Sequence, residues 1–236
     1  MTTIDPIPTA LVAVHMQNDI VGPDGAFAPF FRAEIDRVGT LATAARLLDA
    51  ARAAGVPVVY TRVAWRPDYS DLHANSPLLN IVIQQNCLVD GTPGAAVVDE
   101  LAPQDGDHVV THQRVGGFHD SDLDESLRGA GIDTVVFLGV ATNASVEGTA
   151  RAASDLGYRV LLVSDACSAA TPEAHAASLE SLGLLAEITT TDDLIAALES
   201  QPAPPRSGRI VADRDGQDRD ANLPEPGMCR DPLRGR

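Results

Sequence analysis

Residues 134–163, TVVFLGVATNASVEGTARAASDLGYRVLLV, contain a complete strand, helix and strand unit. The run 134–140 is apolar and β-branched without polar alternation, which is typical of a strand buried on both faces of a parallel sheet. Residues 145–156 are alanine-rich with apolar side chains at helical spacing, and a second apolar run follows at 159–163. This order predicts a right-handed βαβ crossover.

The same alternation continues through the chain. Further strands are predicted at residues 9–14, 57–63, 107–111 and 186–189, and further helices at residues 35–54, 121–130, 172–182 and 191–200. Strands that alternate with helices predict an α/β fold, here a three-layer α/β/α sandwich with a mainly parallel six-stranded sheet in one domain over residues 1–200. Residues 68–93 have no regular pattern and form a candidate insertion that covers substrate.

The composition changes at residue 201. Residues 201–236 are rich in Pro, Gly, Arg and Asp and contain little apolar material to bury. This segment is predicted to be a mostly disordered C-terminal tail.

Charge and hydropathy exclude several classes of partner. The chain has 33 acidic and 17 basic residues, and every basic residue is arginine. Such an acidic surface argues against nucleic acid, whose binding needs clustered positive charge. No apolar run is long enough to span a membrane, and the first ten residues do not resemble a signal peptide. We expect a cytoplasmic protein that acts on a small molecule.

Polar residues that follow the predicted strands are candidates for a functional site. His15 follows the first strand, His112 the third, and the segment Ala141 to Ser145 the fourth. In parallel sheets these carboxyl ends meet at one edge, where ligands bind. The cysteines Cys87, Cys167 and Cys229 lack metal or redox spacing and are interpreted as reduced thiols without a catalytic role.

Three motifs carry a resemblance to a known family. They are LVAVHMQNDI at residues 11–20, VVTHQRVGGFHDSDLDESLR at 109–128 and GVATNASVEGTARAASDLGYRVLLVSDAC at 139–167. In order and spacing they resemble the signature regions of the isochorismatase-like hydrolases, the cysteine hydrolase superfamily. The similarity spans about residues 8–199. It implies hydrolysis of amide, ureide or carbamoyl C–N bonds, or vinyl-ether cleavage in one branch, and it implies a homodimer or a higher homo-oligomer.

The resemblance also implies which positions carry the chemistry. Family members usually have aspartate, lysine and cysteine where this chain has His15, His112 and Ser145. Relatives have a cis peptide at the bond that corresponds to Val140–Ala141, and we expect one here. The residues matching MQND are expected to brace loops around the site, as is Asp165.

Serine is a weak nucleophile and needs a good base, which imidazole provides. The sequence therefore predicts Ser145 as nucleophile, His15 as base and His112 as a group that orients substrate or His15. The backbone N–H groups of Ala141 and Ser145 are predicted to stabilise an oxyanion. Candidate substrate-binding residues are Trp65, Arg114, Phe118, Thr142 and Asn143.

Two other functions stay open. The histidines alone support a non-covalent vinyl-ether hydrolase, lyase, isomerase or cyclase, in which Ser145 only donates a hydrogen bond. Alternatively Ser145 is a helix cap in a non-catalytic pseudoenzyme. The sequence has no cofactor-binding motif and no H-x-H or H-E-x-x-H metal motif, so neither a cofactor nor a metal is predicted.

Overall fold

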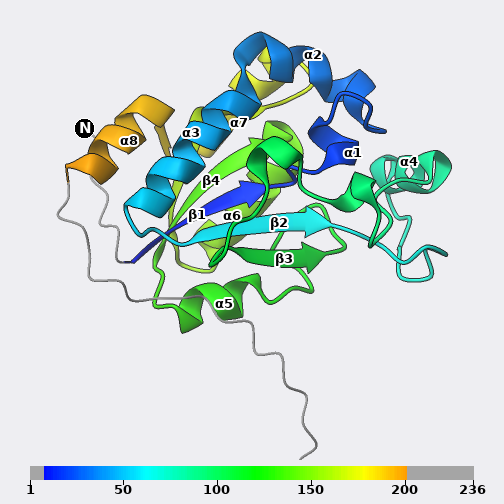
Figure 1. Cartoon of the computed structure of the whole chain (residues 1–236), viewed down its shortest axis with the longest axis horizontal. Coiled ribbons are helices and arrows are strands. Elements are labelled where there is room, and N and C mark those ends of the chain that lie inside the picture. Colours follow the sequence, from blue (N-terminus) through cyan, green and yellow to red (C-terminus); the bar gives the residue numbers. More distant parts are fainter. Residues whose placement is uncertain (1–7, 201–236) are drawn as a thin grey trace, which may run out of the picture.

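The computed structural model describes residues 8–200, and the tail predicted at residues 201–236 lies outside this part. The described residues form a six-stranded, all-parallel sheet in the order β3-β2-β1-β4-β5-β6, with helices on both faces (Figure 1). The α/β/α sandwich predicted from the sequence is confirmed. The strands are β1 (Thr9–Val14), β2 (Val58–Val63), β3 (His108–His112), β4 (Thr134–Val140), β5 (Arg159–Ser168) and β6 (Glu187–Thr189).

The helices complete the order of elements. They are α1 (Asn18–Val21), α2 (Ala28–Val38), α3 (Thr40–Ala53), α4 (Pro77–Gln85), η1 (Pro93–Ala95), η2 (Asp99–Leu101), α5 (Leu123–Gly129), η3 (Thr142–Val146), α6 (Glu147–Asp155), α7 (Pro172–Leu182) and α8 (Thr191–Glu199). Helices α3 and α8 pack together on one face of the sheet, and α5 and α6 lie on the other (Figure 1). None of the helices in residues 8–200 is long and apolar enough to cross a bilayer.

The two central strands explain the unbroken apolar runs in the sequence. Every residue of β1 and of β4 is buried, because each strand has a neighbour on both sides and helices above and below. Gly139 near the end of β4 has a φ of +133°, and a Cβ there would lie 2.2 Å from the Val14 carbonyl oxygen. Only glycine fits this close approach, which brings the carboxyl ends of β1 and β4 together.

Two local predictions are wrong. Residues 35–54 form parts of two helices instead of one, because Gly39 takes a φ of +72° and ends α2 by donating its N–H to the Ile35 carbonyl. The segment predicted to be irregular at residues 68–93 contains α4. This helix begins at Pro77 and is capped by Ser76, whose hydroxyl accepts from Leu79 N–H.

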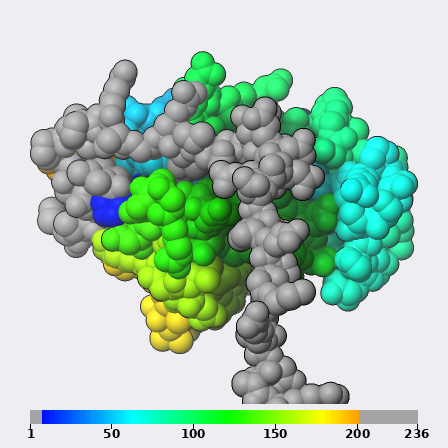
Figure 2. All heavy atoms as spheres, turned by 90° about the horizontal axis from the view of Figure 1, so that it is seen from below, coloured from blue at the N-terminus to red at the C-terminus, as the bar shows by residue number. Residues whose placement is uncertain are grey.

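The segment 68–93 lies beyond the carboxyl ends of the strands, at one end of the molecule (Figures 1 and 2). It is tied back to the sheet through hydrogen bonds at Trp65. The Trp65 N–H donates to the Leu88 carbonyl at 3.0 Å, and the Asp90 N–H donates to the Trp65 carbonyl at 2.8 Å. The carboxylate of Asp19 also accepts from Leu88 N–H at 2.7 Å. These bonds place α4 over the end of the sheet where the candidate site lies.

Candidate active site

His15 follows β1 and turns the chain out of the sheet. Its φ is +54°, in the left-handed region, which costs about 1–2 kcal/mol for a residue with a Cβ. The turn is held by the His15 N–H, which donates to the Thr61 carbonyl at 2.9 Å. The imidazole is buried, with 3% of the residue exposed. The backbone therefore fixes the direction of this ring.

His112 is the last residue of β3 and meets His15 across the carboxyl end of β2. Strand β2 lies between β1 and β3, and Val63 at its end is the register partner of His112. The Nε2 atoms of His15 and His112 lie 3.0 Å apart, and the ring centroids are 5.0 Å apart. Residues 97 positions apart in sequence thus form one hydrogen-bonded pair, which we call the histidine pair.

Both rings are neutral at neutral pH. Burial lowers the pKa of His15 well below 6.5, and the neighbouring His112 lowers it further. Burial lowers the pKa of His112 to about 4, a shift that the Arg114 backbone only partly opposes. A hydrogen bond between two neutral imidazoles needs one Nε2 that carries a proton and one that does not.

The protons of the histidine pair have two possible arrangements, because His112 Nδ1 is buried without a hydrogen-bond partner among residues 8–200 and does not select one of them. The arrangement with a proton on His112 Nδ1 is the one that leaves His15 able to act as a base. A proton on His112 Nδ1 leaves Nε2 as an acceptor, so His15 donates from its own Nε2. The Nδ1 of His15 is then an unprotonated nitrogen.

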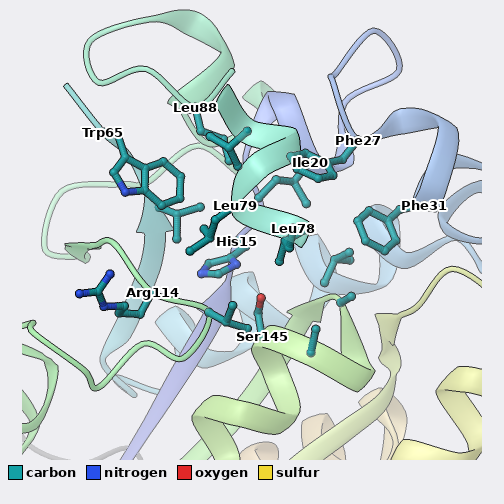
Figure 3. Close-up of a pocket in the computed structure, with 16 residues that line it drawn as sticks. His15, Ile20, Phe27, Phe31, Trp65, Leu78, Leu79, Leu88, Arg114 and Ser145 are labelled. Carbon is teal, nitrogen blue, oxygen red and sulfur yellow. The ribbon is translucent and has the colours of Figure 1, made fainter. Parts of the chain in front are cut away.

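Ser145 lies in the single π-turn η3 that follows β4. The peptide bond Val140–Ala141 before this turn is cis, as the family resemblance predicts. The Ser145 carbonyl accepts from the Thr149 hydroxyl at 2.6 Å, and that hydroxyl accepts from Gly117 N–H at 3.0 Å. The hydroxyl of Ser145 has no hydrogen bond to another residue within 8–200, and Figure 3 shows it on the side of the turn that faces His15. The side chain is therefore free to meet a ligand.

His15, Ala141 and Ser145 border a cavity of about 90 Å³, whereas His112 lies behind His15 and is not among the lining residues. A single water needs about 10–15 Å³, so the space takes a small organic group. The walls are mostly apolar, and the polar side chains among them are few (Figure 3). The lining residues are His15, Ile20, Phe27, Phe31, Val63, Trp65, Leu78, Leu79, Val82, Leu88, Arg114, Val115, Val140, Ala141, Ala144 and Ser145.

The structure brings together only part of the predicted substrate-binding set. Trp65 and Arg114 line the cavity, but Phe118, Thr142 and Asn143 do not. The Phe118 ring stacks instead on Tyr158, at 6.0 Å between ring centroids. The Thr142 hydroxyl pairs with Nδ1 of His175 at 2.8 Å, and Asn143 is exposed.

Sequence reasoning missed the aromatic walls at the start of α2 and the aliphatic walls from α4. Phe27, Phe31, Leu78 and Leu79 line the cavity, yet in sequence they look like ordinary core residues. Nothing in their spacing distinguishes a cavity wall from a packing face. The position of α4 over the end of the sheet is what turns Leu78 and Leu79 into cavity walls.

The loop-bracing residues were predicted correctly. The buried Gln17 side chain donates from Nε2 to the Val63 and Ala95 carbonyls at 2.8 and 2.9 Å, and its Oε1 accepts from Val63 N–H at 2.8 Å. Asn18 and Asp19 hydrogen-bond to the backbone of residues 88–96. The MQND segment thus fastens the insertion to the sheet beside His15.

Within residues 8–200 no group of three or more His, Cys, Asp or Glu side chains is arranged to hold a metal ion. Cys87 and Cys167 are buried free thiols, and burial raises the pKa of each to about 12. Cys229 lies outside the described residues.

The sequence matches the Isochorismatase domain over residues 9–193. The chain belongs to the isochorismatase family. This family member is 37% identical over 177 residues to ureidoacrylate amidohydrolase RutB of Agrobacterium fabrum, which covers 70% of this chain and 77% of that relative.

Solved structures of the family have the same fold. A cysteine hydrolase from Pseudomonas syringae pv. phaseolicola superposes with a TM-score of 0.75 at 33% identity, covering 85% of this chain and 96% of that one. N-carbamoylsarcosine amidase from Thermoplasma acidophilum gives a TM-score of 0.64 at 31% identity, covering 78% and 96%. The relatives of this isochorismatase-family hydrolase thus include proteins named as an amidohydrolase and as an amidase.

Proposed function

We propose that this protein hydrolyses an amide, carbamoyl or ester bond of a small molecule, with Ser145 as nucleophile and His15 as base. The observation that carries the proposal is the histidine pair: a neutral His15, fixed through Nε2 by His112, borders the same cavity as an unbonded Ser145 hydroxyl. Relatives named for amidohydrolase and amidase activity support the reaction class.

In this mechanism His112 performs the task that a carboxylate performs in a Ser-His-Asp triad. By accepting the proton on His15 Nε2 it selects the tautomer in which His15 Nδ1 has a free lone pair. A neutral acceptor stabilises the imidazolium less than a carboxylate does. We therefore expect slower chemistry than in a triad with aspartate.

The covalent route has two steps. Ser145 Oγ bonds to the substrate carbonyl carbon while its proton moves to His15 Nδ1, and the carbonyl oxygen becomes an oxyanion facing the N–H groups of Ala141 and Ser145. The oxyanion collapses, the bond to the leaving nitrogen or oxygen breaks, and that atom takes the proton from His15. Water then bonds to the acyl carbon while its proton moves to His15 Nδ1; the bond from that carbon to Ser145 Oγ breaks, Oγ takes the proton from His15, and the acid is released.

A second candidate function follows from one specific observation. No hydrogen bond joins Ser145 and His15 in residues 8–200, whereas the two histidines are bonded to each other. A neutral pair with one accepting and one donating nitrogen is able to transfer a proton on the substrate itself. This arrangement favours a non-covalent vinyl-ether hydrolase, lyase, isomerase or cyclase in which Ser145 only donates a hydrogen bond.

Trapping an acyl enzyme separates the two routes. The wild type is incubated with p-nitrophenyl hexanoate and acid-quenched, and its peptides are weighed by mass spectrometry. We expect one hexanoyl group on the peptide that contains Ser145, and we expect Ser145→Ala to lower turnover by at least about a thousandfold. The exposed Ser70 provides a matched control, Ser70→Ala, which should behave as wild type.

Each alternative has its own result. Turnover in Ser145→Ala within tenfold of wild type, together with loss in His15→Asn, rejects the covalent route and supports the non-covalent one. Absence of turnover by the wild type on a panel of hexanoyl esters, hexanamides and carbamoyl compounds contradicts both routes and leaves a binding protein.

The cytoplasmic location and the homo-oligomer expected from the sequence stay predictions. Light scattering coupled to size-exclusion chromatography measures the mass in solution directly. A mass equal to one chain of 24.7 kDa contradicts the predicted homo-oligomer.

A further inference from the structure

Among the described residues that line the cavity, Arg114 has the one ionised side chain. His15 is neutral at neutral pH because burial lowers its pKa, and none of the described residues that line the cavity is Asp or Glu. Arg114 remains as the one charged group in an otherwise apolar wall. The whole chain has a formal net charge of −16, so this local positive charge is opposite in sign to the rest of the protein.

The charge of Arg114 is poorly compensated by the protein. Its Nη1 is buried without a hydrogen-bond partner, and its Nη2 lies 3.7 Å from the Asp120 carboxylate. The Asp120 side chain is 67% exposed and also lies 3.2 Å from His119 Nε2. A 3.7 Å contact with an exposed carboxylate contributes little interaction free energy, so the guanidinium of Arg114 keeps N–H donors without a partner.

A second unused donor lies at the same end of the cavity. Trp65 is 2% exposed, and its indole Nε1 is buried without a hydrogen-bond partner. Figure 3 shows Trp65 and Arg114 together on one side, with His15 and Ser145 in the middle. Buried donors without partners are costly, and guanidinium groups match carboxylates in shape and charge. This end of the cavity is thus suited to an anionic acceptor.

The opposite end offers only apolar contacts. Phe27 and Phe31 lie across the cavity from Trp65, and Leu78 lies between the two ends above Ser145 (Figure 3). An apolar chain that enters this end loses water contact without leaving a polar group unpaired.

We propose that the substrate is an acyl conjugate of a small acid, with a carboxylate bound by Arg114 and Trp65 and an apolar acyl chain bound between Phe27 and Phe31. Its amide or ester carbonyl lies beside Ser145, in the middle of the cavity. This assignment rests on the proposed hydrolysis for the identity of the bond cleaved. The preference for a carboxylate joined to an apolar chain rests only on the cavity walls and is tested without turnover.

Three probes of equal chain length test the preference: hexanoate, 1-hexanol and hexylamine. None contains a bond that the proposed reaction breaks, so their binding does not depend on whether the protein is a hydrolase. Trp65 is the only tryptophan in the chain, so intrinsic tryptophan fluorescence reports on this cavity directly. At pH 7 and constant ionic strength, we expect hexanoate to bind at least about tenfold more tightly than 1-hexanol, and hexylamine to bind most weakly.

Matched arginine variants test whether Arg114 causes the preference for a carboxylate. Arg114→Gln should weaken hexanoate binding about 10- to 100-fold and leave 1-hexanol binding unchanged, and Arg114→Lys should retain part of the preference. The control Arg66→Gln makes the same charge change at an exposed residue next to Trp65 and should bind as wild type. Unchanged 1-hexanol binding in Arg114→Gln also shows that the variant is folded.

Three results overturn the proposal: 1-hexanol binds as tightly as hexanoate, Arg66→Gln loses as much affinity as Arg114→Gln, or hexanoate gives no response at millimolar concentration. If hexanoate binds as expected while no ester or amide is cleaved, the proposed hydrolysis fails and the ligand class survives.

Discussion

Replacing His112 by glutamine should remove a large part of the acid sensitivity of folding. The pKa of His112 falls from 6.5 to about 4 on burial, a difference of about 2.5 pH units. Because the folded-state pKa is lowered, the unfolded chain binds more protons below pH 6.5, and protonation favours unfolding. The stability associated with the neutral ring is complete above pH 6.5 and is lost as the pH falls toward 4.

The size of the effect follows from linkage. A shift of one pH unit corresponds to about 1.4 kcal/mol, so His112 contributes about 3 kcal/mol in total, of which about 2 kcal/mol is lost by pH 5. The pKa of His15 is lowered as well, by burial and in smaller part by His112, so removing the imidazole of His112 also makes His15 easier to protonate. The contribution of His112 alone is therefore a lower limit for the difference between wild type and variant.

Urea unfolding followed by far-UV circular dichroism between pH 7.5 and pH 5 measures this difference. We expect the free energy of unfolding of the wild type to fall by about 2 kcal/mol more than that of His112→Gln over this range. Carboxylates titrate in both proteins and cancel in the comparison. His73 is exposed, so His73→Gln should follow the wild-type curve. Parallel curves for wild type and His112→Gln would refute a buried neutral histidine pair.

Two further predictions concern the scaffold. Asp165→Ala removes a carboxylate that accepts from Thr191 N–H at 2.8 Å and from the Thr191 hydroxyl at 2.9 Å, so it should lower the free energy of unfolding by about 1–3 kcal/mol. Differential scanning calorimetry should show a Tm lowered by roughly 3–10 °C, and an unchanged Tm contradicts a bracing role. Gly139→Ala should prevent folding, as judged by soluble yield and circular dichroism, because its Cβ would lie 2.2 Å from the Val14 carbonyl oxygen. Its control Gly129→Ala, on an exposed helix end with nothing within 4 Å of the new Cβ, should fold and gain up to about 1 kcal/mol.

Much of the fold could be predicted from local sequence because its strands are buried on both faces. The apolar runs 134–140 and 9–14 predict strands β4 and β1 with the bounds that the structure shows, because a strand with helices on both faces is apolar throughout. The helical periodicity of residues 35–54 continues across Gly39, although this residue takes a φ of +72° and separates α2 from α3. Periodicity alone does not show whether a glycine interrupts a helix or lies within it.

The candidate site could be predicted where its residues follow strands, and not where they come from the insertion. His15, His112 and the Ala141–Ser145 turn meet because parallel strands carry their carboxyl ends to one edge. Phe118 lies in the same loop after β3 as Arg114, yet its ring packs on Tyr158 outside the cavity. The direction of a side chain in a loop depends on contacts that are distant in sequence.

The sequence by itself determined the six strands, their alternation with helices, the family and the strand ends at which polar residues gather, because these follow from local apolar patterning and from motif spacing. The tertiary structure alone decided that two imidazoles 97 residues apart share one hydrogen bond, that burial keeps both neutral and that Arg114 is the one charged side chain among the described residues of a mostly apolar cavity. Burial and hydrogen bonding depend on which distant segments pack together, and it is packing, not residue type, that sets a pKa and leaves a donor without a partner.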